Sequence, residues 1–325
     1  MLYLGVDSGG TKAAFLLCDE AGRVIARHRE PGCTALSGRK AGVKRMLETG
    51  IAEICRKAQI HQEDIAALGL GLCGYGEGEE IAREVSEACA EAFLPGRYAC
   101  ALDTYVGWAG SLLMEPGINI IAGTGSVVYG AAGDGRTARA GGWGAGCDEG
   151  SCSWHGQKLI EAYTKQADGR MPRTALYFIF REHFGITGED EAFVMALNHE
   201  IACSRKSLAE LQYLLHRAWL QGDPVADGIY RLGAEELFAG VETVARKLGL
   251  CWEGLKVSYS GGLFKAGECV LGPLSERIAA RGGALVKPAY EPDVGAVLMA
   301  IRFHQPGYDV SQFMLKEESA NGNHS

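Results

Sequence analysis

The N-terminal part of the chain alternates short hydrophobic runs with longer stretches in which hydrophobic and polar residues follow a helical period. In the first run, Leu2, Leu4 and Val6 alternate with Tyr3 and Gly5, as the two faces of a strand do. The pattern predicts strands at residues 3–6, 13–18, 24–29, 67–73 and 98–102, and helices at 41–58, 79–92 and 105–114. The predicted order is therefore βββαβαβα, an α/β arrangement.

The second part of the chain repeats this order from Ile118 onward. A mostly helical insertion from about Ser151 to Leu250 interrupts it, with amphipathic patterns such as LAELQYLLHRAWL. The last residues, KEESANGNHS, lack hydrophobic periodicity. We therefore predict an N-terminal lobe at residues 1–117, a C-terminal lobe at 118–310 and a flexible tail at 311–325.

A glycine-rich turn joins the first two predicted strands. Gly9 and Gly10 permit the tight turn and close backbone approach that a phosphate requires, and Thr11 and Lys12 offer it a hydroxyl and a cation. Asp7, at the mouth of the first strand, is placed to hold Mg²⁺ or its water shell. The alternative is an ordinary DSGG β-turn, because short glycine motifs are frequent in loops.

Two further glycine turns favour the phosphate interpretation. INIIAGTGSVVYGAA places Gly123, Thr124, Gly125 and Ser126 between two hydrophobic runs, and the strand-like LKVSY is followed by a turn with Gly261 and Gly262. The chain contains no GxxxxGK[ST] motif, and no GxGxxG opens a helix after the first strand. In this order the three turns resemble the phosphate-1, phosphate-2 and adenosine elements of the actin, Hsp70 and sugar-kinase superfamily. That resemblance implies a two-lobed, ribonuclease-H-like fold with ATP and Mg²⁺ between the lobes, and predicts that Asp7, Gly125 and Gly261 line one cleft.

A longer block narrows the resemblance to one family. GGWGAGCDEGSCSWHGQKLI is similar to the GGWG…GDEGS…W block of the N-acetylglucosamine kinase and BadF/BadG ATPase family, and further similarity lies around LDTYVGWAGSL and EPDVGAVLMA. The resemblance covers roughly residues 1–302. It implies an ATP-dependent kinase whose acceptor is a hexosamine-type sugar, such as N-acetylglucosamine.

Asp103 is the predicted catalytic residue. It follows the strand-like YACAL and precedes a helix, which places its carboxylate at the carboxyl end of a sheet, where open α/β proteins bind ligands. In the resembling kinases the matching aspartate accepts the proton of the sugar hydroxyl that attacks the γ-phosphate. The alternative is that Asp103 serves only as the N-cap of the following helix, and the two roles are compatible.

The expected sugar contacts come from the resemblance alone. Asp148 would hydrogen-bond sugar hydroxyls, Trp143 and Gly144 would shape the pocket, and Cys73 and Gly74 would lie near an acetamido group. Plain core packing is the alternative for Trp143, because large aromatic side chains bury area wherever they sit.

Three departures from the family pattern fall on the acceptor side. Cys33-Thr34-Ala35 stands where the family usually has an asparagine that contacts the sugar, one residue is missing between Trp143 and Asp148, and Cys147 replaces a glycine. Loss of a hydrogen-bonding group can change discrimination by orders of magnitude. These departures therefore leave open whether the preferred sugar is N-acetylglucosamine or another sugar.

Composition and charge agree with a small-molecule enzyme. The 325 residues are 47% hydrophobic, enough to fill two cores, and 32 basic against 40 acidic residues give a net charge of −8, which disfavours nucleic-acid binding. No signal peptide or membrane-length hydrophobic run is visible, so we expect a cytoplasmic protein, with a homodimer allowed. The 11 cysteines lack a CxxC motif and indicate reduced thiols.

Two other functions stay open at this stage. One is an ATPase activator of an acyl-CoA dehydratase or reductase, which holds an iron–sulfur cluster between two subunits with a pair of cysteines from each; neither Cys147 nor Cys152 has the sequence context of that role. The other is a sugar- and ATP-binding module without turnover, since a phosphate motif alone does not guarantee catalysis.

Overall fold

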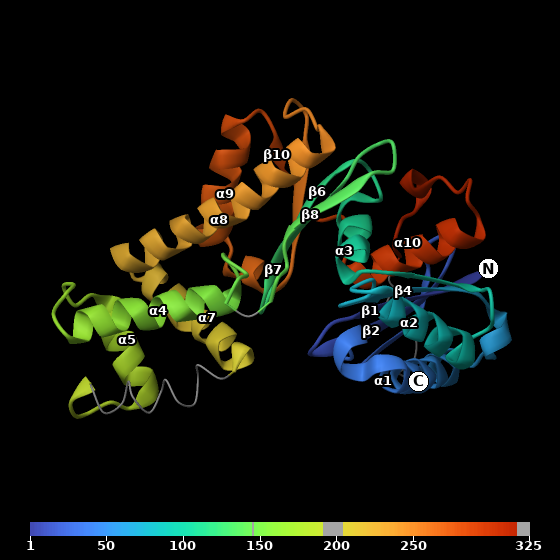
Figure 1. Cartoon of the computed structure of the whole chain (residues 1–325), viewed down its shortest axis with the longest axis horizontal. Helices are drawn as coiled ribbons and strands as arrows, with labels where there is room; N and C mark the ends of the chain where they lie inside the picture. Colours follow the sequence, from blue (N-terminus) through green and yellow to red (C-terminus); the bar gives the residue numbers. More distant parts are fainter. Residues whose placement is uncertain (145, 191–203, 317–325) are drawn as a thin grey trace, which may run out of the picture. The chain divides into compact units, whose positions relative to one another are not determined.

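The computed structural model describes residues 1–144, 146–190 and 204–316 (Figure 1). The chain divides into two compact units. Unit 1 consists of Met1–Glu115 together with the segment from Pro288 onward, and unit 2 is Pro116–Lys287. Within the described part of the chain, no helix is both long enough and apolar enough to cross a bilayer.

Unit 1 is built on a five-stranded mixed sheet. Its spatial order is β3-β2-β1-β4-β5, where β1–β2 and β2–β3 pair antiparallel and β1–β4 and β4–β5 pair parallel. The strands are β1 (Leu2–Ser8), β2 (Lys12–Asp19), β3 (Val24–Pro31), β4 (Ile65–Leu72) and β5 (Tyr98–Ala101). The five strands predicted for this part of the sequence are confirmed, each within a few residues of its expected bounds.

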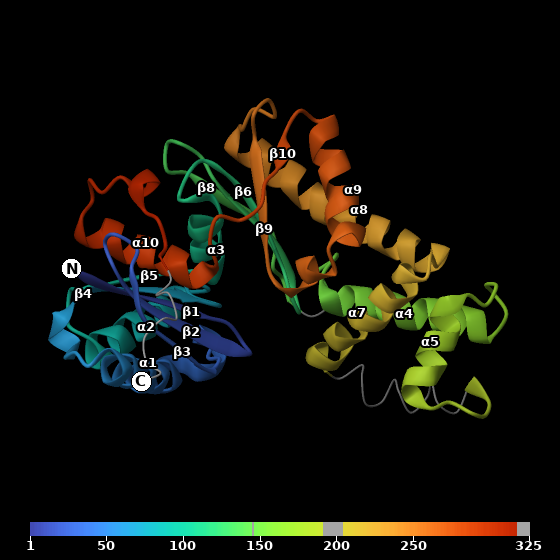
Figure 2. The ribbon, with the colours of Figure 1, turned by 180° about the vertical axis from the view of Figure 1, so that it is seen from behind.

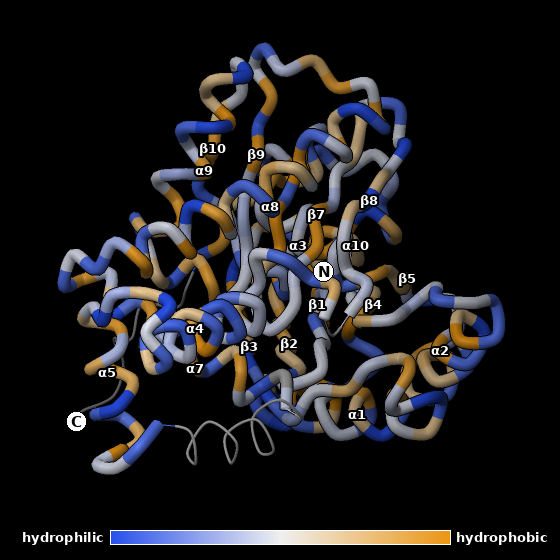
Figure 3. The backbone as a smooth tube through the Cα atoms, turned by 60° about the vertical axis from the view of Figure 1, so that its left-hand side comes forward, coloured by the Kyte–Doolittle hydropathy of each residue, from blue (hydrophilic) through white to orange (hydrophobic). Residues whose placement is uncertain are grey.

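Helices cover both faces of this sheet. On one face α1 (Ala35–Ala58) and α2 (Glu79–Ala92) bury a core that includes Phe15, Leu47 and Val85, with the short η1 (Gln62–Asp64) leading into β4. In Figure 3, hydrophobic and hydrophilic residues alternate along α1 and α2, as expected for helices with one buried face. On the other face lie α3 (Asp103–Leu112) and α10 (Pro292–His304), which pack against each other. α1 begins at Ala35, where Thr34 caps it by accepting a hydrogen bond from the Ser37 N–H. The non-helical backbone of Arg39, with φ +48°, then interrupts the helix, and the part after Arg39 matches the predicted helix at 41–58.

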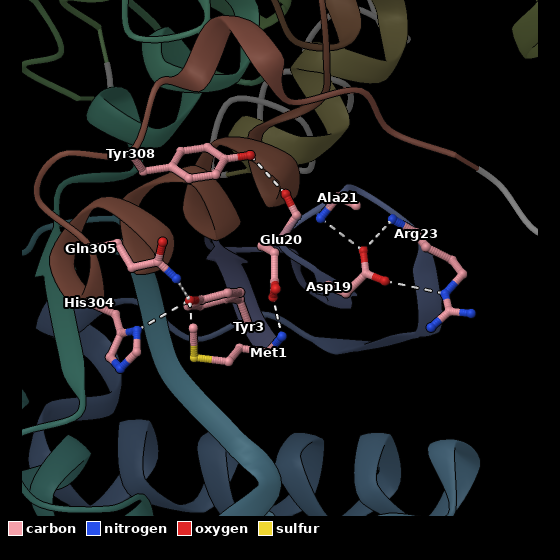
Figure 4. Close-up of polar contacts among 9 residues, drawn as sticks. All are labelled: Met1, Tyr3, Asp19, Glu20, Ala21, Arg23, His304, Gln305 and Tyr308. Carbon is pink, nitrogen blue, oxygen red and sulfur yellow. Dashed lines mark hydrogen bonds and ion pairs between the residues drawn. The ribbon is translucent and has the colours of Figure 1, made fainter.

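Helix α10 belongs to unit 1, whereas the sequence placed residues 118–310 in the second lobe. Its backbone approaches β1 so closely that a Cβ on Gly5 would lie 2.4 Å from the Asp293 carbonyl oxygen. The segment after α10 is also tied to the N-terminal strands (Figure 4). Gln305 donates to the Tyr3 hydroxyl at 2.6 Å, and the Tyr308 hydroxyl donates to the Glu20 carbonyl at 2.8 Å. These contacts attach α10 to the sheet of unit 1, although α10 follows the strands of unit 2 in the sequence.

The start of the predicted tail is also part of unit 1. After η3 (Val310–Gln312), Phe313 is buried, and the Lys316 N–H donates to the Gly22 carbonyl at 2.8 Å. The segment 311–316 is therefore anchored to unit 1 through Phe313 and Lys316, and the rest of the predicted tail, 317–325, lies outside the described residues.

Unit 2 repeats the sheet topology of unit 1. Its spatial order is β10-β9-β6-β7-β8, with β6–β7 and β7–β8 antiparallel and β6–β9 and β9–β10 parallel (Figure 2). The strands are β6 (Gly117–Ala122), β7 (Ser126–Ala131), β8 (Thr137–Gly141), β9 (Lys256–Ser260) and β10 (Ala284–Leu285). The same order in both units confirms the predicted duplication and the fold class.

The helices of unit 2 confirm the predicted helical insertion over the residues that the structure describes. Between β8 and β9 come α4 (Cys152–Ala167), α5 (Ala175–Phe184), α7 (Arg205–Leu220) and α8 (Pro224–Leu248). The short η2 (Gly262–Ala266) and α9 (Glu268–Ala280) follow β9. One core joins the strand residues Ile118 and Ile120 to Val241 and Val244 of α8 and to Leu274 of α9. Residues 191–203 of the predicted insertion lie outside the described residues.

Candidate functional site

The first predicted phosphate turn joins β1 to β2 in unit 1. The Gly9 N–H donates to the Lys12 carbonyl at 3.0 Å, which closes the hairpin, and the side chains of Thr11 and Lys12 are exposed. Gly32 packs directly on the turn, since a Cβ there would lie 2.2 Å from the Gly9 carbonyl oxygen. Any larger residue at this position would force the turn apart.

Asp7 lies among other carboxylates of unit 1. Its pKa is raised to about 7, mainly by burial and then by the charge of Asp103, with smaller contributions from Asp293 and Glu291, while the charge of Lys12 lowers it. Asp293 is itself buried and forms an ion pair with Arg27 at 2.9 Å. An excess of negative charge around a partly buried carboxylate is the environment that a divalent cation stabilises.

The residues fit a magnesium ion that is shared with a ligand. In the described residues, no group of three or more histidine, cysteine, aspartate or glutamate side chains is arranged to enclose a metal. Magnesium ordinarily binds through one or two carboxylates, several waters and substrate phosphates, and needs no such enclosure. Asp7, one turn before the exposed Thr11 and Lys12, meets that requirement.

Asp103 occupies the first position of α3, and Leu102 is the N-cap. One carboxylate oxygen of Asp103 accepts a hydrogen bond from the Thr104 N–H at 2.9 Å. Burial raises the pKa of Asp103, and hydrogen bonds from the Thr104 backbone and from the Cys73 side chain oppose this rise. The alternative that Asp103 is the N-cap residue is wrong, because Leu102 holds that position. Asp103 nevertheless accepts a hydrogen bond from a helix N–H. A carboxylate with a raised pKa at the end of a strand is suited to accept a proton.

Asp7 and Asp103 lie at the carboxyl ends of parallel strands of the sheet, β1 and β5, which β4 separates. Asp7 of β1 is paired with Gly71 of β4, and Gly71 with Ala101 of β5. Because parallel strands end at one edge of a sheet, the residues that follow β4 and β5 reach the same edge as Asp7. The charge of Asp103 acts on Asp7, as this register requires.

Cys73 and Gly74 extend this edge toward the start of α1. The Cys73 N–H donates to the Ser8 carbonyl at 3.0 Å, and the Ala35 N–H donates to the Cys73 carbonyl at 2.8 Å. Ala35, the residue that departs from the family pattern, therefore lies beside the predicted acceptor residues. It presents only a buried methyl group there.

The two glycine turns of unit 2 lie side by side. β6 and β9 are parallel neighbours, with Ile121 opposite Ser260, so both turns emerge at the same edge of the second sheet. Gly261 has φ +108°, and a Cβ on it would lie 2.3 Å from the Ala122 carbonyl oxygen. A Cβ on Gly123 would lie 4.0 Å from the Gly262 nitrogen. Bare backbone from both turns therefore forms one surface.

The GTGS turn is tied to the DEGS segment. The Ser126 hydroxyl donates to the Glu149 carbonyl at 2.5 Å, and the Cys152 N–H donates to the Gly123 carbonyl at 2.8 Å. The Ser126 hydroxyl therefore already donates its hydrogen to a backbone carbonyl. Contact of Ser126 with a phosphate stays a prediction, as it does for Thr124 and Gly125.

The predicted sugar residues of unit 2 share one loop. Buried Asp148 accepts a hydrogen bond from the Gly144 N–H at 2.9 Å, and Cys147, which is exposed, donates its N–H to the Gly144 carbonyl at 3.1 Å. Trp143 is 76% exposed, with the Arg139 guanidinium 5.7 Å from its ring centroid. Core packing, the alternative for Trp143, is therefore wrong within unit 2.

Sequence reasoning missed Asp293, Glu291 and Arg27. Asp293 lies on α10 and Glu291 just before it, far in sequence from the first glycine turn, and Arg27 lies on β3. The signal that could have found Glu291 and Asp293 is EPDVGAVLMA, because an acid at the start of a helix that is hydrophobic all round marks a helix buried at its N-terminus. The structure places the predicted residues in two groups, one in each unit, and a common cleft for Asp7 and Gly125 stays a prediction.

Comparison of the whole fold defines the class of protein. A crystal structure of a ROK family glucokinase from Streptomyces griseus, in complex with glucose and AMPPNP, matches with a TM-score of 0.56 at 18% identity, covering 94% of this chain and all of that one. The chain therefore has the fold of sugar kinases and actin-like ATPases. Residues 4–300 match the BadF/BadG/BcrA/BcrD ATPase family, and the chain belongs to that family. The family recognised from the glycine turns and the GGWG block is confirmed.

Three relatives that match most of this chain are named as kinases of amino sugars. An N-acetylmuramic acid/N-acetylglucosamine kinase of Clostridium acetobutylicum is 27% identical, over 80% of this chain and 84% of the relative. An N-acetyl-D-glucosamine kinase of Dictyostelium discoideum is 26% identical, over 92% and 98%. A crystal structure from Chromobacterium violaceum, named as a candidate N-acetylglucosamine kinase, has a TM-score of 0.75 at 28% identity, covering 92% of this chain and 98% of that one.

Proposed function

We propose that this chain transfers the γ-phosphate of ATP to a hydroxyl group of a hexosamine-type sugar, N-acetylglucosamine or a related amino sugar. Similarity to two kinases of that substrate class, over 80% and 92% of this chain, supports the proposal. Membership of an ATPase family supports ATP as the phosphate donor.

One observation carries the proposal: two carboxylates with raised pKa values lie at the carboxyl ends of strands in the same sheet. Asp7, among three other acids, is the group for Mg²⁺, and Asp103, which accepts hydrogen bonds from Thr104 and Cys73, is the general base. When bound, Mg²⁺ neutralises charge on the phosphates. Asp103 would take the proton of the acceptor hydroxyl, while Cys73 and the Thr104 N–H hold its carboxylate in place.

Backbone and side-chain donors from both units would bind the phosphates. In unit 1 these are the glycine turn at Gly9 and Gly10 with the exposed Thr11 and Lys12; in unit 2 they are the Gly123–Ser126 turn and the neighbouring turn at Gly261 and Gly262. Phosphoryl transfer requires mainly positioning and charge neutralisation, so these groups and one base are sufficient. We propose that both groups of residues act on one ATP.

Trp143, Gly144 and Asp148 in unit 2, and Cys73 and Gly74 in unit 1, are the proposed sugar contacts. Exposed Trp143 offers a flat aromatic face, and the Asp148 carboxylate, which accepts the Gly144 N–H, lies in the same loop. The side chain of Ala35, whose backbone N–H is bound to the Cys73 carbonyl, has no group that could hydrogen-bond a sugar. This favours a sugar whose substituent at that position needs no amide partner, so its identity has to be measured across several amino sugars.

Cys147 and Cys152 have no contacts that suggest the iron–sulfur alternative, because Cys147 is exposed in the GGWG loop while Cys152 is buried at the start of α4.

The proposed kinase activity is tested with Asp103→Asn, which keeps the size of the side chain and an oxygen for the Thr104 N–H. Sugar-dependent ADP release should fall by about 10² or more, the scale of a positioned general base. ATP binding, measured by calorimetry, should persist.

The matched control is Asp19→Asn, because Asp19 also accepts backbone N–H groups, those of Ala21 and Arg23, in the turn between β2 and β3 (Figure 4). Its activity should equal that of the wild type. Near-wild-type turnover by Asp103→Asn with a good sugar acceptor would show that the base lies elsewhere, and Asp148 would be the next candidate.

A further inference from the structure

Two thiols of unit 1 meet between α2 and β5. The Sγ atoms of Cys89 and Cys100 are 3.4 Å apart, close enough for one thiol to donate a hydrogen bond to the other. Both cysteines are free in this structure. Neither belongs to the proposed kinase site, so a role for this pair is independent of the proposed function.

The two sulfurs differ in their access to solvent. Cys89 is fully buried in the core beneath α2, beside Val85 and Ala88. Cys100 is partly exposed on β5, which is an edge strand of the sheet and pairs with β4 alone among the described strands. A small reagent would therefore reach Cys100 first, and Cys89 would be the neighbouring thiol behind it.

The surrounding contacts hold the pair in place. The Tyr98 hydroxyl, two residues before Cys100, donates to the Ser86 carbonyl at 2.9 Å, one helical turn before Cys89. This bond fixes the start of β5 against α2 on the same side as the thiols. A disulfide bond is about 2.05 Å long, so the two sulfurs need to approach each other by only about 1.4 Å.

We propose that Cys89 and Cys100 form a reversible dithiol–disulfide site whose oxidant is a hydroperoxide. The Cys100 thiolate attacks the peroxide oxygen, giving a sulfenic acid and, with hydrogen peroxide, hydroxide. The Cys89 sulfur then attacks the Cys100 sulfur, its proton leaves with the departing oxygen as water, and the S–S bond forms. In total, two thiols and one hydrogen peroxide give one disulfide and two waters.

The chemistry of the pair supports this order of events. The hydrogen bond with Cys100 and then burial raise the pKa of Cys89, so its thiolate is disfavoured as the first nucleophile. A sulfenic acid at Cys100 would form in contact with the second thiol. Condensation to the disulfide is then faster than further oxidation, because the resolving sulfur is already adjacent.

Peptide mapping of the full-length protein tests the site directly. The reduced protein is treated with stoichiometric hydrogen peroxide, remaining thiols are alkylated in denaturant, and the chain is digested with trypsin without reduction. Cleavage at Arg83, Arg97 and Arg136 puts Cys89 and Cys100 in separate peptides, 84–97 and 98–136, each with one cysteine. We expect these two peptides to be joined by a disulfide, and dithiothreitol to release both.

Two variants accompany the wild-type map. In Cys100→Ser the Cys89 thiol should stay free after the same treatment, whereas Cys55→Ser, which removes a half-buried thiol of α1 outside the pair, should leave the 84–97/98–136 link intact. Recovery of Cys89 as a free thiol beside a sulfinic acid at Cys100, or pairing of either residue with another cysteine, would overturn the proposal. The wild-type map alone decides the question if a variant does not fold.

Discussion

Replacing Asp7 with asparagine should stabilise the metal-free protein, and should do so more at high pH than at low pH. The pKa of Asp7 rises from 3.8 to about 7 in the folded state, mainly through burial and then through the charge of Asp103. Between these two pH values the unfolded chain binds fewer protons than the folded chain. The contribution of Asp7 to stability is therefore greatest below pH 3.8 and falls as the pH rises to about 7, when the carboxylate is left ionised among other acids.

The size of the effect follows from the pKa shift. At about 1.4 kcal/mol per pKa unit, the ionised Asp7 costs up to about 4 kcal/mol above pH 7 and about 1.7 kcal/mol at pH 5. Asparagine has no charge to bury, so its advantage over aspartate should grow by about 2–3 kcal/mol from pH 5 to pH 8. Because this is a difference between two pH values, any pH-independent effect of the substitution cancels.

The measurement is urea unfolding in EDTA at pH 5 and pH 8, followed by circular dichroism, on the wild type, Asp7→Asn and the control Asp19→Asn. The control should not reproduce the gain, since Asp19 lies in the turn between β2 and β3 (Figure 4). Added Mg²⁺ should stabilise the wild type at pH 8 and not Asp7→Asn. An equal difference between Asp7→Asn and wild type at both pH values would refute the carboxylate cluster as the cause.

Two further predictions concern unit 2. Exposed Trp143 should report sugar binding, so the intrinsic fluorescence change on adding a sugar substrate should be lost in Trp143→Phe and kept in Trp252→Phe; an unchanged signal in Trp143→Phe would remove Trp143 from the sugar site. Buried His155 binds the Ser151 carbonyl through Nδ1 at 2.8 Å, and burial lowers its pKa from 6.5 to about 4. Its unfolded form binds more protons in that range, so its contribution to stability is complete above pH 6.5 and about 3 kcal/mol is lost as the pH falls through 4. Urea unfolding at pH 7 and pH 4 should show this loss in wild type and in the exposed control His183→Gln, and a smaller loss in His155→Gln; equal losses in all three would contradict it.

The local parts of this protein could be predicted from its sequence, because short-range patterns determine them. The alternation around Leu4, the glycine turns and the order of strands and helices each depend on neighbouring residues, and the family block around Trp143 identified the fold. Duplication was visible because both halves begin with the same strand–turn–strand layout.

The long-range parts could not be predicted in this way. Helix α10 joins unit 1 because Gly5 and Gly69 leave room for its backbone on β1 and β4, and nothing near α10 in the sequence encodes that fit. The same packing brings Asp293 to Asp7. The bond from Ser126 to Glu149 also depends on a contact between distant loops. In these places tertiary packing decides, and periodicity carries no information about it.

Coupled ADP release across a panel of amino and N-acetylated hexoses, with a no-sugar control, is the most direct test of the proposed kinase. The assay contains MgATP and the wild-type protein, with Asp103→Asn in parallel. We expect ADP release that requires Mg²⁺, rises strongly with at least one hexosamine-type sugar, and falls by about 10² or more in Asp103→Asn. ATP hydrolysis at the same rate with every sugar and without one would contradict the account.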